Sequence, residues 1–336
     1  MPINIHLRIL VTVLLLGGML FSCSGKKQEK EPENETVLEE NGKRGEVNIA
    51  IDETLEPLMK QVVKNFLGRT PKATLHVFYV PEGEGMQMLL EDSVRVFFGT
   101  RDFLPAERQV IEAAQIKPRT VDIGAGAVAV LVNKDLGLEK LSNEELAGIL
   151  KGEIKNWNEV EPELGDVKVS VIYDTPSSSV VRMVLDTYID TDSLPANSYS
   201  AGNTAKLIEF VEQSPGAIGL IGYAYISDRD DSVSQDILSR VRLVSLEAPD
   251  TSKFAGSYYL PYQNEIKLGR YALSRPFVSL SREHFMGLGT GFVNFTAGEI
   301  GQRILLKAGY VPAFAPPRVI VLPEKEEEVL ETEQQN

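Results

Sequence analysis

The sequence lacks the residues that disulfide scaffolds, metal centres and nucleic-acid-binding surfaces require. Its 336 residues include one cysteine and three histidines, so an intramolecular disulfide is excluded and no spacing typical of a zinc site occurs. Lys and Arg number 34 against 48 Asp and Glu, which disfavours nucleic acid as a partner. No G-x-S-x-G motif and no phosphate-binding loop with Lys is present. We therefore expect no enzyme, no metal and no other cofactor.

The longest apolar run lies at the N-terminus. Arg8 precedes about 13 mostly apolar residues that end at Phe21, whereas a membrane-spanning helix needs roughly 20. A short run behind a basic residue is typical of a secretory signal peptide. The segment Leu20-Phe21-Ser22-Cys23 resembles a bacterial lipobox. We predict a signal peptide over residues 1–22 and a lipid on Cys23; the alternative is an uncleaved anchor or a buried free cysteine.

Two further segments are too polar to form a hydrophobic core. Residues 23–46 are rich in Lys, Glu and Asn and are predicted to be a flexible tether. Residues 316–336 are rich in acidic residues after Pro323 and are predicted to be a solvated acidic tail. These assignments leave a folded body between them and place the protein in the cell envelope, on the periplasmic side or at the cell surface.

Apolar runs alternate with amphipathic segments through the body. Residues 47–51 suit a buried strand, and the next segment predicts a helix with one apolar face, formed by Leu55, Met59, Val62, Val63 and Phe66. The alternation continues with strands at 73–80, 94–100, 126–133 and 167–174 and helices at 83–92, 102–115 and 176–189. Ser142 and Glu145 fit a capping box, so another helix begins there. The pattern predicts an α/β fold with a mainly parallel sheet flanked by helices.

Four segments, taken in order, resemble the PstS-type phosphate-binding proteins, the solute receptors of bacterial ABC phosphate importers. They are residues 126–160 with a G-x-I-x-x-W turn, SPGAIGLIGYAYIS at 214–227, YALSRPF at 271–277, and 292–312 with a G-Y-V-P end. The resemblance covers about residues 47–315. It implies a two-lobed type II periplasmic-binding fold, in which each lobe has a central, mostly parallel sheet flanked by helices and two crossover strands join the lobes.

The resemblance also implies where the lobes and the ligand lie. Lobe 1 would combine residues 47–124 with 270–315, and lobe 2 would be residues 125–269. The ligand would be enclosed between them, in the kind of cleft that binding sites favour. Lobe closure by a hinge motion fits two separately cored lobes.

Six residues are candidates for contact with an oxyanion. The family's phosphate loop at a helix N-terminus is matched by Ser177, Ser178 and Ser179. Free N–H groups and the helix dipole make this place suitable for an anion. The alternative role of these serines is to cap the helix. The resemblance also implies ligand contact for Thr54, in the first strand–helix turn, and for Arg101 and Asp102. In the family, an aspartate at this last place accepts the proton of a protonated phosphate and so rejects sulfate; Asp102 could instead cap the next helix.

The chain departs from the family pattern in its charges. Tyr173 stands where the family has an arginine, and Arg182, one turn into the following helix, could replace that arginine or be an ordinary surface side chain. Acidic residues occupy two loops where the family has small polar residues, namely Asp52, Glu53, Glu82 and Glu84. Carboxylates beside an oxyanion oppose its binding unless they are paired with arginine or turned to solvent.

These departures leave two interpretations. In the first, Arg101 or Arg182 forms salt bridges to the acids, and the protein is a lipid-anchored, monomeric solute-binding protein that captures inorganic phosphate or a related oxyanion for an ABC permease. In the second, the protein is a surface lipoprotein of the same fold that acts as a sensor or adhesion module, with a different ligand or no small ligand.

Overall fold

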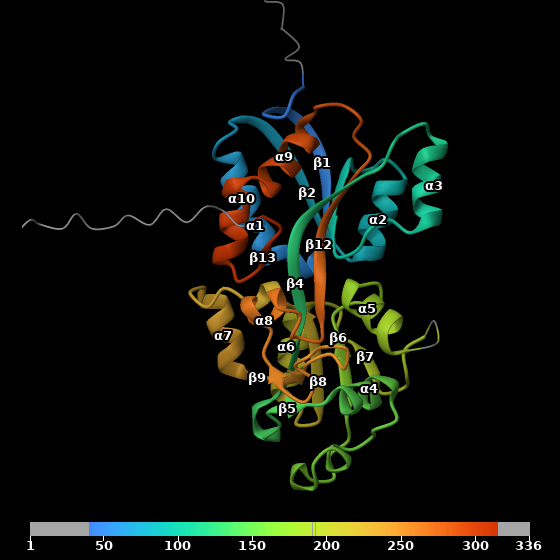
Figure 1. The fold of residues 1–336 in the computed structure, drawn as a ribbon, viewed down its shortest axis with the longest axis vertical. Helices are drawn as coiled ribbons and strands as arrows, with labels where there is room; N and C mark the ends of the chain where they lie inside the picture. The colour runs from blue at the N-terminus through green and yellow to red at the C-terminus, as the bar shows by residue number, and fades with distance from the viewer. Residues whose placement is uncertain (1–39, 190, 192, 315–336) are drawn as a thin grey trace, which may run out of the picture. The chain divides into compact units, whose positions relative to one another are not determined.

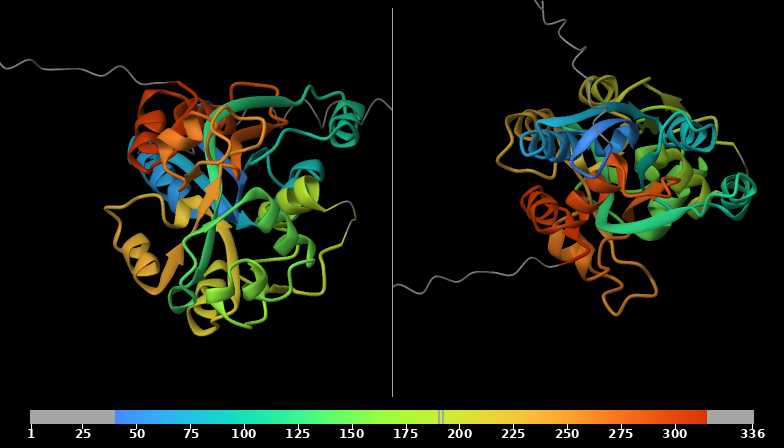
Figure 2. Two further views of the ribbon diagram at one scale, coloured as in Figure 1. Left: turned by 60° about the horizontal axis from the view of Figure 1, so that its bottom comes forward. Right: turned by 90° about the horizontal axis from the view of Figure 1, so that it is seen from above.

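The computed structural model describes residues 40–189, 191 and 193–314. The predicted signal peptide, the predicted lipidation site Cys23, most of the tether and the tail from residue 316 lie outside the described residues. The described chain forms two lobes that share one long strand, and helices pack on the faces of the sheets (Figure 1 and Figure 2). No helix among the described residues is both long enough and apolar enough to cross a membrane.

Lobe 1 is built on a sheet with the strand order β2-β1-β3-β12-β4. β1 (Arg44–Asp52) pairs in parallel with β2 (Lys72–Val80) and β3 (Val96–Gly99), while β12 (Ser274–Ser281) is antiparallel to both β3 and β4 (Arg119–Asn133). A short strand, β13 (Val311–Pro312), also pairs with β4. The helices of this lobe are α1 (Glu56–Leu67), α2 (Glu82–Leu90), α3 (Pro105–Ala113), α9 (Leu288–Ala297) and α10 (Glu299–Lys307).

Lobe 2 continues the same sheet in the order β4-β8-β6-β7. β6 (Ser170–Tyr173) pairs in parallel with β8 (Ala217–Gly222) and β7 (Ser198–Ser200), and β9 (Val241–Leu243) pairs with β4. A small second sheet contains β5 (Lys140–Leu141), β10 (Ser245–Glu247) and β11 (Tyr258–Tyr259). The helices that follow these strands are α4 (Asn143–Lys151), α5 (Ser179–Tyr188), α6 (Thr204–Gln213), α7 (Ser232–Arg240) and α8 (Gln263–Lys267).

Two strands connect the lobes. The N-terminal half of β4 pairs with β12 as far as Ala127, and its C-terminal half pairs with β8 from Val128 onward. The chain therefore enters lobe 2 along β4 and returns to lobe 1 along β12, as Figure 1 shows for the long green and orange strands. The prediction of a two-lobed α/β fold with two crossover strands is confirmed, whereas the residue boundaries proposed for the lobes stay a prediction.

The local sequence patterns account for most of these elements. α1 buries Leu58, Met59, Val62 and Phe66, which recur at the spacing of one helical face. At the start of α4, Ser142 Oγ accepts from the Glu145 N–H at 3.2 Å and the Ser142 N–H donates to Glu145 Oε2 at 2.8 Å, so the predicted capping box is confirmed.

One difference concerns the start of the first strand. β1 begins at Arg44, inside the segment predicted to be a tether, and Arg44 pairs with Lys72 of β2. Backbone hydrogen bonds in a strand do not depend on apolar side chains, so composition alone could not show this extension.

Candidate functional site

Three buried side chains from distant parts of the chain meet where the lobes contact each other. Arg275 of β12 donates from Nη2 to Thr54 Oγ1 and from Nη1 to Ser179 Oγ, both at 2.7 Å. The Thr54 and Ser179 hydroxyl oxygens lie 3.3 Å apart. Arg275 is 5% exposed and the two hydroxyl residues are fully buried. The structure thus brings together two predicted residues around an arginine that the sequence analysis did not single out.

The turns before these residues fix their positions. β1 ends at Asp52, whose Oδ1 accepts from the Thr54 N–H at 2.8 Å and from the Thr54 hydroxyl at 2.7 Å. These bonds start the 3-10 turn η2 (Glu53–Leu55). In lobe 2, Ser178 caps α5 by accepting from the Val181 N–H at 3.3 Å, so Ser179 occupies the first helical turn.

The charge of Arg275 is not balanced by an ion pair among the described residues. Its guanidinium donates to hydroxyl oxygens, although an unpaired buried charge is costly. The carboxyl groups of Asp52 and Asp174 are also fully buried, and one oxygen of each, Oδ2, finds no hydrogen-bond partner in the part of the chain that the structure describes. Burial raises the pKa of both aspartates, and the nearby positive charge of Arg275 opposes the rise.

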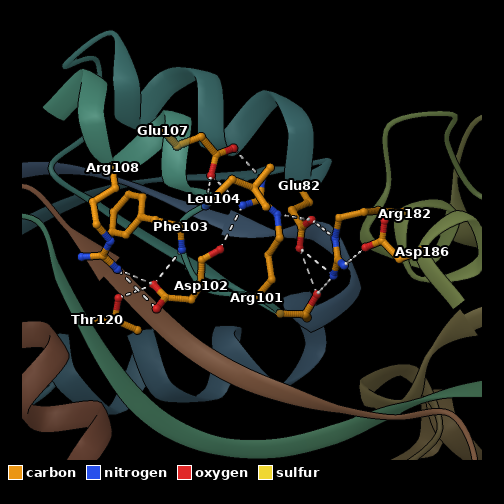
Figure 3. Close-up of polar contacts among 11 residues, drawn as sticks. Glu82, Arg101, Asp102, Phe103, Leu104, Glu107, Arg108, Thr120, Arg182 and Asp186 are labelled. Atoms are coloured by element: carbon orange, nitrogen blue, oxygen red, sulfur yellow. Dashed lines mark hydrogen bonds and ion pairs between the residues drawn. The ribbon is translucent and has the colours of Figure 1, made fainter. Parts of the chain in front are cut away.

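The other predicted contact residues have their partners elsewhere. Ser178 acts as the helix cap, and Ser177 is exposed, with its carbonyl oxygen accepting from the Gly83 N–H at 3.2 Å. Arg101 pairs with Glu107 and Glu82, as Figure 3 shows. These contacts do not join Ser177, Ser178 or Arg101 to the Arg275 cluster, so their roles as ligands stay predictions.

Asp102 is also placed away from that cluster. Its side chain is 55% exposed and lies between Arg108, at 3.1 Å, and the hydroxyl of Thr120, at 2.5 Å (Figure 3). Its Oδ1 also accepts from the Phe103 N–H at 2.7 Å. These contacts stabilise the loop before α3. They give no support to a proton-accepting role for Asp102.

The acidic side chains of the two loops lie in different environments. Glu82 forms ion pairs with both Arg101 and Arg182, so the interpretation that these arginines neutralise an acid is confirmed for Glu82. Glu53 accepts from the Thr175 hydroxyl at 2.8 Å, and Glu84 is exposed. Arg182 is therefore not a free surface side chain, and its role in place of the family's arginine stays a prediction.

The sequence contains one feature that could have indicated Arg275 as a functional residue. The residue lies within YALSRPF, where it is the one charged residue in a strand that is otherwise apolar or weakly polar. A charge in a predicted buried strand is uncommon and requires a partner. The partner could not be named, because Thr54 is 221 positions away along the chain.

Glu53 makes the stability of the fold depend on pH. Burial raises its pKa to about 7, although the Thr175 hydroxyl opposes the rise. The native state therefore binds this proton more tightly than the unfolded chain, so the contribution is present in acid and is lost as pH rises towards 7. We expect the free energy of unfolding of the wild type, relative to E53Q, to fall by about 1 kcal/mol between pH 5 and pH 8, since Glu53 is only partly buried and is screened by solvent.

Urea unfolding at the two pH values measures this difference. E84Q is the matched control, because Glu84 is exposed and should contribute little at either pH. Equal pH dependence in the wild type and E53Q would show that the Glu53 carboxyl titrates alike in the folded and unfolded chains.

Comparisons with known proteins agree with this architecture. A family model described as the PBP superfamily domain matches residues 36–299. The phosphate-binding protein PstS of Bacillus subtilis is 24% identical over 307 residues, which cover 90% of this chain and 93% of that protein. PstS of Staphylococcus haemolyticus is 25% identical over 80% of this chain and 81% of its own.

Solved structures show the same fold. A protein of Clostridium perfringens, described as a phosphate ABC transporter substrate-binding protein with bound phosphate, superposes with a TM-score of 0.65 at 19% identity, covering 80% of this chain and all of the other. An ABC-type phosphate transport receptor of Vibrio cholerae gives a TM-score of 0.59 at 20% identity, with coverage of 80% and 100%.

These matches confirm the resemblance to PstS-type proteins and the periplasmic-binding fold. The relatives and neighbours named here are described as binding proteins and transport receptors, which agrees with the prediction of a binding protein. Since the family model spans most of the sequence, the chain belongs to the PBP superfamily.

Proposed function

We propose that the protein is a lipid-anchored solute-binding protein that binds inorganic phosphate between its lobes and delivers it to an ABC permease. The names of the relatives support phosphate as the ligand. The lobes would correspond to the predicted ranges 47–124 with 270–315 and 125–269. Lipidation at Cys23 would hold a monomeric protein at the membrane, on the periplasmic side or at the cell surface.

The observation that carries the proposal is the buried guanidinium of Arg275. It is held by the hydroxyls of Thr54 and Ser179 at 2.7 Å and forms no ion pair among the described residues. An oxyanion would supply the missing negative charge and accept from both guanidinium nitrogens, a bidentate arrangement that matches its geometry. The Ser179 hydroxyl and the first turn of α5 would donate to the same anion.

Binding at this place requires the lobes to move apart slightly. Thr54 belongs to lobe 1 and Ser179 to lobe 2, and in this arrangement both contact Arg275 directly. An anion that takes the place of these contacts would separate the two hydroxyls and then bridge them. The bound and unbound arrangements of the lobes would be the two states that a permease can distinguish.

Asp52 is better placed than Asp102 to accept a proton from the ligand. It is fully buried, and its Oδ2 has no hydrogen-bond partner within the described ranges, whereas Asp102 is largely exposed and bonded to Arg108 and Thr120. A protonated phosphate can donate to Asp52 Oδ2, and sulfate at neutral pH cannot. Sulfate would place two acceptors against each other, which predicts discrimination between the anions.

Isothermal titration of the purified protein with phosphate, and separately with sulfate, tests the proposed function. Bound ligand is first removed by partial unfolding and refolding. We expect phosphate to bind with a micromolar or lower Kd and sulfate to give no heat. If protein shown to be folded gives neither heat nor a thermal shift with phosphate, the proposal fails, and a sensor or adhesion module of the same fold becomes the better assignment.

A further inference from the structure

A second polar cluster joins the lobes through the side chain of Glu82, which is 2% exposed. Its carboxylate accepts from Thr100 Oγ1 at 2.9 Å and from Arg101 Nε at 3.2 Å, both in lobe 1. It also pairs with Nε of Arg182, on α5 of lobe 2 (Figure 3). One buried carboxylate therefore contacts donors from both lobes.

The donors around Glu82 are fixed by other partners. Arg101 donates to both carboxylate oxygens of Glu107 at 2.7 Å. Arg182 donates to Asp186 at 2.8 Å and to Thr100 Oγ1 at 3.2 Å. These contacts would hold both guanidinium groups in place without Glu82. One hydroxyl and two guanidinium groups that converge on one point form a donor set suited to an oxyanion.

We propose that Glu82 is a tethered anion: its carboxylate occupies an anion site formed by Thr100, Arg101 and Arg182, and thereby holds the two lobes together without a ligand. The proposal goes beyond phosphate binding and does not depend on it. It assigns to Glu82 the place that a free carboxylate or similar small anion would otherwise take.

Neighbouring contacts reinforce this assignment. The Gly83 N–H donates to the Ser177 carbonyl oxygen at 3.2 Å, so the residue after Glu82 also contacts lobe 2. Thr175 of lobe 2 donates to Glu53 of lobe 1 at 2.8 Å. Of these interlobe contacts, only the one made by Glu82 joins a buried carboxylate to a guanidinium. Removal of the Glu82 carboxylate therefore leaves the positive charges of Arg101 and Arg182 without their shared partner.

Removing the tethered anion should separate the lobes, and a free anion should restore them. We expect E82A to shift the ratio of joined to separated lobes at least about tenfold towards separation. Small-angle X-ray scattering in phosphate-free buffer would show this shift as a larger radius of gyration. Formate should return E82A to the wild-type radius, because it supplies the missing carboxylate. E84A, on the exposed side of the same helix, is the matched control and should keep the wild-type radius.

Arg182→Ala distinguishes an anion site from a general loosening. R182A should also expand, but formate should not reverse its expansion, because the lobe 2 donor is absent. Where E82A does not fold, as judged by circular dichroism, E82Q keeps the side-chain volume and should expand without responding to formate. A folded E82A with the wild-type radius, or an expansion that formate leaves unchanged, would overturn the proposal. Phosphate is absent throughout, so a failure here and a failure of phosphate binding are separate results.

Discussion

Arg275→Met is expected to weaken phosphate binding at least about 100-fold while leaving the fold as stable as the wild type or more so. The loss of affinity follows because the variant removes a desolvated bidentate charge contact, whose truncation costs roughly 2–5 kcal/mol in comparable sites. The stability should not fall, because the guanidinium is 5% exposed and has no ion pair among the described residues, and because the buried carboxyls of Asp52 and Asp174, whose pKa values burial raises and Arg275 lowers, can take up protons when that charge is removed. Replacing a poorly compensated buried charge by an apolar side chain of similar volume is often neutral or stabilising.

The opposite signs of the two effects separate a ligand-binding role from a structural one. An arginine that merely holds Thr54 and Ser179 together would lower the stability when it is removed, and it would change affinity only through that loss. Isothermal titration gives the affinity, and urea unfolding gives the stability. R275K provides a graded variant that keeps the charge but loses the planar fork. R108M replaces a more exposed arginine outside the cluster and should change neither quantity by much.

Phosphate affinity retained in folded R275M would remove the basis of the proposed site. Lower stability together with lost binding would instead identify Arg275 as a structural link between the lobes. Only lost binding at unchanged or higher stability supports the role proposed here. Residues at functional sites commonly carry such a local cost in stability.

The sequence predicted the elements of the fold well because their causes are local. The apolar face of α1 and the capping box at Ser142 depend on residues within one or two helical turns. The crossover strands were implied only by the family resemblance, since the pairing of β12 with β4 joins segments that are far apart in the chain. The start of β1 at Arg44 was missed, because backbone pairing leaves no apolar pattern there.

The candidate site was less predictable because its contacts are not local. Ser178 and Ser179 are adjacent, yet one caps α5 and the other meets Arg275, and nothing in a run of serines distinguishes the two roles. The carboxylate that contacts Thr54 of the arginine cluster is likewise not the one that the motif indicates. Asp102 faces solvent and Arg108, whereas Asp52 contacts Thr54, because the turn after β1 directs it inward.

The two clusters differ in how their positive charges are balanced. Glu82 supplies the anion for Arg101 and Arg182, whereas Arg275 forms no ion pair with any residue that the structure describes. A chain that carries acids in its ligand loops can therefore still present a buried cation that forms no ion pair among the described residues to an external anion. The net charge of −14 does not decide the local sign, because fields at short range in a buried site outweigh those of screened surface charges.

Asp52→Asn is expected to reduce the preference for phosphate over sulfate at least about 100-fold. The amide keeps the shape of the side chain, and its oxygen can still accept from the Thr54 N–H and hydroxyl. The amide NH₂ then replaces Oδ2, a buried acceptor that no described residue contacts by a hydrogen bond, by a donor. Sulfate gains a hydrogen bond there, while protonated phosphate loses the acceptor for its proton, and unpaired buried polar groups of this kind give discrimination of 100-fold or more.

The comparison is best made at pH 8 by titration with each anion. Burial raises the pKa of Asp52, so in acid this carboxyl carries its own proton and could donate it to sulfate; wild-type selectivity should therefore weaken as pH falls. D102N is the decisive control, because Asp102 holds the place that the family motif indicates. If D102N changes the selectivity and D52N does not, the exposed aspartate must move into the site on binding, and the buried position of Asp52 is not what rejects sulfate. If D52N alone changes the selectivity, the residue that accepts the phosphate proton is Asp52, which the first strand–helix turn directs towards Thr54 and Arg275.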